Sequence, residues 1–183
     1  MNASLTKITS ILLVFLLIFI FVFLTKNNYF ILAGIIIFIV VWSIYIQIHE
    51  HYQQDDPKLK EIREKLEMFF DNKKDWEYPL HTLNGKNIMK DISLYRGNKS
   101  YTINKEKIYI CLKDENGQYY NDNTLYYVIG HELSHAICDE IGHTDKFHLI
   151  FDALLLKMTK EGFYNPDILM INNYCKDGDP EII

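Results

Sequence analysis

The sequence predicts an α+β domain that follows two transmembrane helices. Three observations support this fold class: two long uncharged apolar segments near the N-terminus, short strand-like segments in the middle, and two amphipathic helical patterns beyond them. The 183 residues are 49% hydrophobic, which is enough for one domain of ordinary size. We expect a transmembrane hairpin over residues 1–48, a polar linker over 49–56 and the α+β domain over 57–183.

Both apolar segments are long enough to cross a bilayer, which needs about 20 residues. Ile11 to Leu24 contains no polar residue, and Leu5 and Ile8 extend the apolar pattern toward the N-terminus. Tyr29 to Ile48 carries no charge. A cleaved signal peptide and a buried helical pair are the alternatives, but the sequence LTKNNYF lacks the small-residue pattern of a cleavage site. The pair therefore predicts a multi-pass membrane protein.

Charge and cysteine patterns predict that the domain lies in the cytoplasm. In a hairpin, Lys7 and the basic residues between Lys58 and Lys65 lie on one side of the membrane, whereas the loop has only Lys26. The positive-inside rule places the more basic side in the cytoplasm. The odd set of cysteines has no zinc-finger spacing and fits a reducing compartment: Cys111, Cys138 and Cys175. Two Asn-x-Ser sequences keep a luminal orientation open.

The domain begins with a helix and continues with strands. Asp56 and Pro57 are a helix cap and a first helical residue, and apolar residues follow at helical spacing: Leu59, Ile62, Leu66, Phe69 and Phe70. Alternating apolar and polar residues predict strands over 91–96 and 100–104. The apolar run from Ile108 to Leu112 predicts a third strand, and Asn116-Gly117 predicts a turn.

The stretch GHELSHAICDEIGHTDKF, residues 130–147, contains a pattern typical of a metal site. His131 and His135 are four positions apart, so on a helix they project from one face and can bind one zinc ion. Glu132 is placed to accept a proton from water at the metal. A pair of surface histidines is the alternative. The apolar surroundings and the preceding strand favour the metal site.

The ends of this helix and the start of the next indicate a third ligand. Asn123 or Thr124 can cap the helix, and Gly142 can end it in a left-handed conformation. A catalytic zinc needs three protein ligands and one open position. His143 follows the predicted helix end and is the expected third ligand, with His148, Asp139 and Glu140 as competitors. Thr144 is the expected cap of a second helix that ends at Gly162 and would hold this histidine in place.

HELSH and GHTDKF, together with the following apolar helix, resemble the WLM metallopeptidases, relatives of the SprT and Spartan-type proteases. The preceding KIYICLKDENGQYYNDNTLYYVIGHELSH is also similar to that family, and GFYNPDILMINNYC resembles the tail of minimal membrane-anchored versions in large DNA viruses. The resemblance covers about Ser100 to Cys175. It implies a compact zincin fold, with His131, His135 and His143 as zinc ligands and Glu132 as the general base.

These roles predict a membrane-anchored zinc peptidase that acts on proteins or peptides. The strand Ile108 to Leu112 is a candidate edge for an extended substrate, although an internal core strand is an equal alternative. Tyr174 is a candidate donor to the oxyanion, with packing of its ring as the alternative. Cys138 follows His135 closely and is expected to be a buried structural thiol.

The same residues bear on other functions. Net charge −5 and the lack of a basic tail argue against a nucleic-acid partner. A CAAX-prenyl-protease-like membrane peptidase would take a glutamate ligand from a later helix, where only Glu161 and Glu181 remain. A membrane anchor with a structural zinc site is the non-enzymatic alternative. Glu132 argues against it, because a structural site needs no base beside its first ligand.

Overall fold

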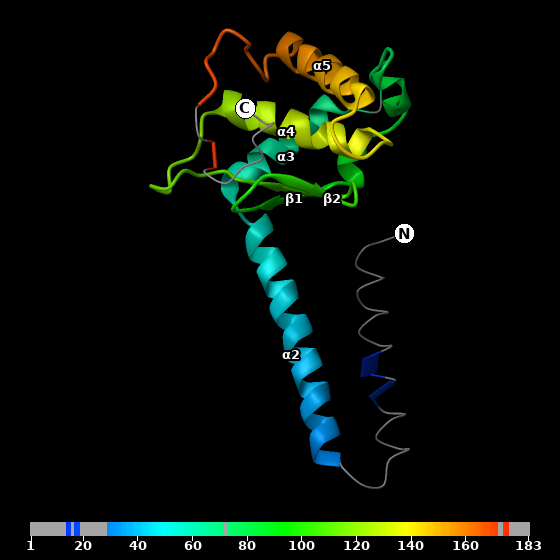
Figure 1. The fold of residues 1–183 in the computed structure, drawn as a ribbon, viewed down its shortest axis with the longest axis vertical. Helices are drawn as coiled ribbons and strands as arrows, with labels where there is room; N and C mark the ends of the chain where they lie inside the picture. Colours follow the sequence, from blue (N-terminus) through cyan, green and yellow to red (C-terminus); the bar gives the residue numbers. More distant parts are fainter. Residues whose placement is uncertain (1–13, 16, 19–28, 72, 172–173, 176–183) are drawn as a thin grey trace. The chain divides into compact units, whose positions relative to one another are not determined.

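The computed structural model describes residues 14–15, 17–18, 29–71, 73–171 and 174–175. The chain divides into two units, Met1–His49 and Glu50–Ile183. Within the described residues, the second unit contains helices and a small mixed sheet, so the predicted α+β class is confirmed at that level. Figure 1 shows the elements in sequence colours.

Helix α2, Tyr29–Gln54, contains the second predicted span. Its segment Leu32–Gln54 has a mean hydropathy of 2.1 and is long and apolar enough to cross a membrane. The first predicted span, residues 11–24, lies largely outside the described residues. A single candidate span is therefore found in the described part of the chain. Helix α2 also continues to Gln54, so most of the predicted polar linker is helical.

Helix α3, Pro57–Phe69, begins where the sequence predicts. Asp56 has an extended backbone, which the following proline favours, and its Oδ1 accepts a hydrogen bond of 3.0 Å from the Lys58 amide. The four buried residues of α3 share one face: Leu59, Ile62, Leu66 and Phe69. The amphipathic pattern of the sequence thus supplies one side of the core.

The sheet has the strand order β1-β3-β2, with β1 at Ser93–Arg96, β2 at Tyr101–Ile103 and β3 at Lys107–Ile110. β1 pairs with β3 in parallel, and β2 pairs with β3 antiparallel. β3 is therefore the central strand, so of the two alternatives for this segment the internal core strand is confirmed and the substrate edge is wrong. The apolar run of β3 reflects burial, because Ile108 and Ile110 are both fully buried.

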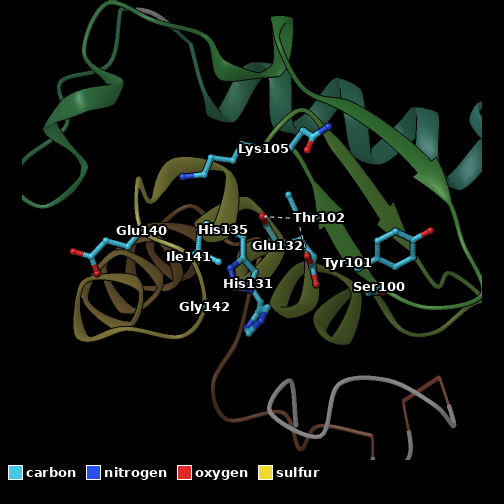
Figure 2. A pocket seen from close by; sticks show the side chains of 11 residues that line it. Ser100, Tyr101, Thr102, Lys105, His131, Glu132, His135, Glu140, Ile141 and Gly142 are labelled. Carbon is cyan, nitrogen blue, oxygen red and sulfur yellow. Dashed lines mark hydrogen bonds between the residues drawn. The ribbon is translucent and has the colours of Figure 1, made fainter.

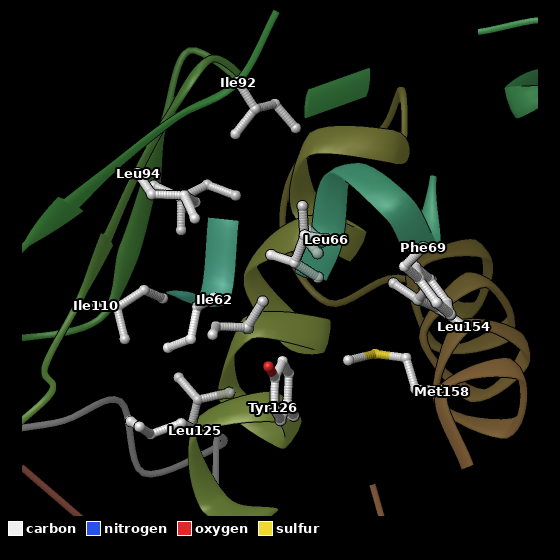
Figure 3. Packing of buried hydrophobic residues seen from close by; sticks show 14 of the residues in the cluster. Ile62, Leu66, Phe69, Ile92, Leu94, Ile110, Leu125, Tyr126, Leu154 and Met158 are labelled. Atoms are coloured by element: carbon white, nitrogen blue, oxygen red, sulfur yellow. The ribbon is translucent and has the colours of Figure 1, made fainter. Parts of the chain in front are cut away.

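The remaining helices complete the domain. α4, Asp122–Ile137, contacts both β2 and β3, and α5, Asp145–Lys160, packs against α4. Asn121 caps α4 by accepting a hydrogen bond of 2.8 Å from the Thr124 amide, two or three residues before the expected cap. The 3-10 helices Leu80–Leu83 and Ile88–Lys90 precede the sheet. Figure 3 shows Ile62 and Leu66 of α3 between strand residues Leu94 and Ile110 and Met158 of α5, with Leu125 and Tyr126 of α4 beside them.

Two of the three cysteines form a disulfide, Cys111–Cys175, and Cys138 is a buried free thiol. The expectation that Cys138 is a buried structural thiol is confirmed, whereas the sequence did not predict the Cys111–Cys175 pair. The bond ties the segment after α5 to the residue that follows β3. Disulfides persist mainly in oxidising compartments, so this pair opposes the cytoplasmic side that the basic residues predict.

Leu66→Ala is expected to lower the free energy of unfolding by about 2–5 kcal/mol. Leu66 is fully buried in the core, and its truncation leaves a cavity between α3 and its neighbours. Met68→Ala on the same helix is the control, because Met68 is 67% exposed and its loss should cost little. Denaturant unfolding of both variants measures the difference. Equal stabilities would contradict this core.

Candidate metal centre

Helix α4 carries the first two candidate ligands on one face. His131 is buried and His135 is half-buried, and their ring centroids are 5.0 Å apart. The spacing of four positions brings the two side chains one turn apart on the same side of the helix. Ser134, which lies between the two histidines in sequence, is buried. Its hydroxyl donates a hydrogen bond of 2.7 Å to the Gly130 carbonyl within the helix, so it is not a candidate ligand.

His143 reaches the same point from the loop between α4 and α5. Helix α4 ends at Ile137, five residues earlier than the expected Gly142. Gly142 instead lies in the loop with φ 84°, a left-handed conformation that favours glycine. Thr144 then caps α5, with its hydroxyl oxygen accepting a hydrogen bond of 3.3 Å from the Phe147 amide. His143 is thus held between a glycine turn and a helix cap.

The three imidazoles converge on one point. His143 Nε2 lies 3.0 Å from His131 Nε2 and 3.1 Å from His135 Nε2, and one ligand atom from each residue lies within 4.8 Å of the others. Two nitrogens bound to a tetrahedral zinc at 2.0–2.1 Å are separated by about 3.3 Å. The donor set and its spacing therefore fit a divalent metal ion. Neutral imidazole is also a common ligand of such ions.

The competing ligands lie elsewhere. His148 is exposed on α5, with its ring centroid 6.3 Å from that of His143. Asp139 is paired with Lys146 at 2.7 Å, and this hydrogen bond lowers the pKa of the Asp139 carboxyl. Glu140 is exposed in the same loop. Within the described residues, the candidate metal cluster contains only the three histidines.

The Phe147 ring packs against all three histidine rings. Its ring centroid lies 4.3 Å from that of His135, 4.8 Å from that of His143 and 5.0 Å from that of His131. In the sequence, Phe147 ends the motif GHTDKF, four residues after His143. The structure places its ring against all three histidine rings.

Glu132 lines the same cavity as the histidines. The cavity has a volume of about 440 Å³ and is lined by β2 with the residues that flank it, by α4 and by the loop after α4: Ser100, Tyr101, Thr102, Asn104, Lys105, His131, Glu132, His135, Glu140, Ile141 and Gly142. Figure 2 shows Glu132 beside His131, facing Thr102 on the strand. The carboxylate is therefore next to the candidate metal position without belonging to the histidine cluster.

Tyr174 is fixed by contacts with the chain. Its hydroxyl donates to the Cys111 carbonyl at 2.6 Å and lies 2.9 Å from Ser100 Oγ, and the residue is 3% exposed. Burial raises the pKa of this phenol above its usual range. Tyr174 is also not among the residues that line the cavity. The arrangement matches the packed alternative, because the hydroxyl proton is already used by Cys111.

Cys138 is also part of the scaffold. It is 1% exposed, and its amide donates to the Ser134 carbonyl at 2.8 Å at the end of α4. The Lys105 ammonium donates to its carbonyl. These contacts place Cys138 at the helix end and outside the histidine cluster of the described residues.

The sequence is similar to proteins of large DNA viruses. "Uncharacterized protein 136R" of Invertebrate iridescent virus 6 is 40% identical over 121 residues, which cover 62% of this chain and 68% of that protein. "Uncharacterized protein 042R" of Invertebrate iridescent virus 3 is 42% identical over 98 residues, 53% of this chain and 62% of that protein. "Uncharacterized protein R325" of Acanthamoeba polyphaga mimivirus is 35% identical over 86 residues, 43% of this chain and 44% of that protein.

No protein-family model and no solved structure matches the sequence. Family membership therefore rests on the viral relatives, and above all on the alignment that covers 68% of the iridescent virus 6 protein at 40% identity. The chain belongs to the family of protein 136R of Invertebrate iridescent virus 6.

Proposed function

We propose that the protein is a zinc-dependent peptidase whose domain is similar to the WLM metallopeptidases. The observation that carries the proposal is the convergence of His131, His135 and His143 on one point beside Glu132. Three protein ligands that leave a position for water are typical of catalytic zinc sites. Glu132 is buried, directly follows the first ligand on α4 and lines the cavity without belonging to the cluster, so it is the expected general base.

The chemistry is hydrolysis of a peptide bond. When bound, Zn²⁺ supplies Lewis acidity: it lowers the pKa of water at the metal to about 7 and polarises the substrate carbonyl. Glu132 accepts a proton from the attacking water as the water oxygen bonds to the carbonyl carbon. Glu132 then donates this proton to the amide nitrogen as the carbon–nitrogen bond breaks. His131, His135 and His143 would hold the ion.

An extended substrate fits the edge strand β2. β2 is an outer strand of the sheet, and within the described residues its free side has no further strand. Tyr101 and Thr102 of β2 line the same cavity as Glu132. A peptide that adds to this edge would pair its backbone with β2 and bring a carbonyl beside the histidines. The substrate edge is thus proposed for β2 in place of β3.

The two alternatives predict different ligands or different activity. A CAAX-prenyl-protease-like site needs a later glutamate, but Glu161 is engaged with Lys74 and Lys157 at the end of α5, and Glu181 lies outside the described residues. A structural zinc site would bind metal without cleaving peptides. The histidine set and the open cavity beside it favour the catalytic site.

The experiment that tests this function is cleavage of unfolded proteins by the full chain purified in detergent. We expect cleavage to stop when a chelator removes the metal and to return when Zn²⁺ is added. A reference sample treated with chelator already saturated with zinc should stay active. Metal binding without cleavage of any member of a broad substrate set would favour the structural alternative.

We also propose that the chain is anchored in a membrane through α2, with the apolar segment 11–24, extended by Leu5 and Ile8, as a second span. The basic residues after α2 predict a cytoplasmic domain, whereas the Cys111–Cys175 disulfide predicts an oxidising compartment. If the two spans form a hairpin, protease added to sealed vesicles should find both the N-terminus and the domain on one face. Opposite accessibility would contradict the hairpin and leave one span.

A further inference from the structure

A threonine on the edge strand contacts the proposed general base. Thr102 Oγ1 lies 2.7 Å from Glu132 Oε2 and 3.0 Å from the Glu132 carbonyl oxygen. Both partners are acceptors when the carboxylate is ionised, so the hydroxyl is the donor. Figure 2 shows Thr102 reaching from the strand toward Glu132. The shorter distance, to a charged oxygen, indicates the stronger of the two contacts.

Thr102 is itself held firmly. It lies in the middle of β2, where it pairs with the fully buried Ile108 of β3. β-Branched side chains such as threonine have few χ1 rotamers, so the backbone of the strand largely sets the direction of the hydroxyl. Glutamate has three side-chain torsions and is adaptable by comparison. The hydrogen bond from Thr102 therefore restricts the orientation of the Glu132 carboxylate.

We propose that Thr102 is a positioning residue that holds the Glu132 carboxylate in the orientation needed for proton transfer. This inference rests on the proposed peptidase function. General-base catalysis requires the base within hydrogen-bond reach of the attacking water, and small misplacements lower the rate strongly. Because Thr102 also belongs to the edge proposed for the substrate, one strand aligns the scissile carbonyl and the base. The pair is 30 residues apart in sequence, so local patterns do not reveal it.

The test is a comparison of Thr102→Val and Thr102→Ser in the full chain. Valine keeps the branched shape and strand preference but removes the hydroxyl, whereas serine keeps the hydroxyl. We expect Thr102→Val to lower kcat by about 10- to 100-fold, the size of a lost hydrogen bond to a charged group, with little change in KM. Thr102→Ser should restore most of the rate. Zinc content should stay the same in both variants.

Thr159→Val is the matched control, because Thr159 Oγ1 donates to the Leu155 carbonyl at 2.9 Å within α5 and does not line the cavity. Its kcat should equal that of the wild type. Thr102→Val should also add little to the loss caused by Glu132→Gln, since both act through one group. An active wild type together with a fully active Thr102→Val would overturn the positioning role and leave the peptidase function standing. A wild type that cleaves nothing would refute the function, and with it any catalytic role for Thr102.

Discussion

Replacing Glu132 by Gln is expected to lower peptide cleavage by about 10²- to 10⁴-fold. The amide is close in shape to the carboxylate but cannot accept a proton from water at neutral pH. Glu132 lines the cavity beside the histidines and is not part of their cluster, so the variant should keep its fold and its zinc. Initial rates on an unfolded protein substrate and metal analysis of the same preparation measure both effects.

Glu140→Gln is the matched control for this substitution. Glu140 lines the same cavity but is exposed in the loop after α4. Its amide variant should cleave at nearly the wild-type rate, because Glu140 is exposed in the loop, whereas Glu132 is buried directly after His131. Equal activity of Glu132→Gln and the wild type would contradict the base role. Loss of zinc in Glu132→Gln would instead make this residue a ligand.

Replacing His143 by Ala is expected to weaken zinc binding by more than about 100-fold. Loss of a residue that only hydrogen-bonds a metal ligand already costs about 10- to 100-fold in affinity, and His143 is itself a proposed ligand. The substitution removes the nitrogen that lies 3.0 Å from His131 Nε2 and 3.1 Å from His135 Nε2, and it leaves two ligands from one helix. Two neutral ligands hold the ion poorly at neutral pH, so cleavage should fall with the zinc content. Competition with a fluorescent chelator measures the affinity.

His148→Ala provides the corresponding control for the histidine. His148 is exposed on α5 and lies outside the cluster of described ligands. It should bind zinc as tightly as the wild type. If His143→Ala kept its affinity while His148→Ala lost it, the third ligand would be His148, and the loop between α4 and α5 would have to rearrange when the metal binds.

Local contacts made much of this structure predictable from sequence. The starts of α3 and α5 depend on Asp56 and Thr144, each of which bonds an amide only two or three residues away. The histidine pair on α4 follows from helical spacing alone. The cap of α4 was misplaced because Asn121 lies in a polar run in which several neighbouring residues can also cap a helix.

Long-range pairing was beyond these patterns. The alternation of residues predicts strands, but it does not say that β3 lies between β1 and β2, and the proposed substrate edge changes with that order. The Cys111–Cys175 disulfide joins residues 64 positions apart, and the contact between Thr102 and Glu132 spans 30. Contacts at such sequence separations produce no periodic pattern in the sequence. The sequence therefore predicts the histidine cluster with Glu132 beside it, but it does not predict the contact from Thr102 or the disulfide.

The most direct test of the metal centre is a crystal structure of zinc-loaded protein with anomalous scattering measured at the zinc edge. We predict one anomalous peak, from a zinc ion bound by Nε2 of His131, His135 and His143. The Glu132 carboxylate should lie near the ion without coordinating it. An open coordination position should face the cavity beside β2. A site without a peak, or a peak whose fourth ligand is Glu132, would contradict a catalytic zinc centre.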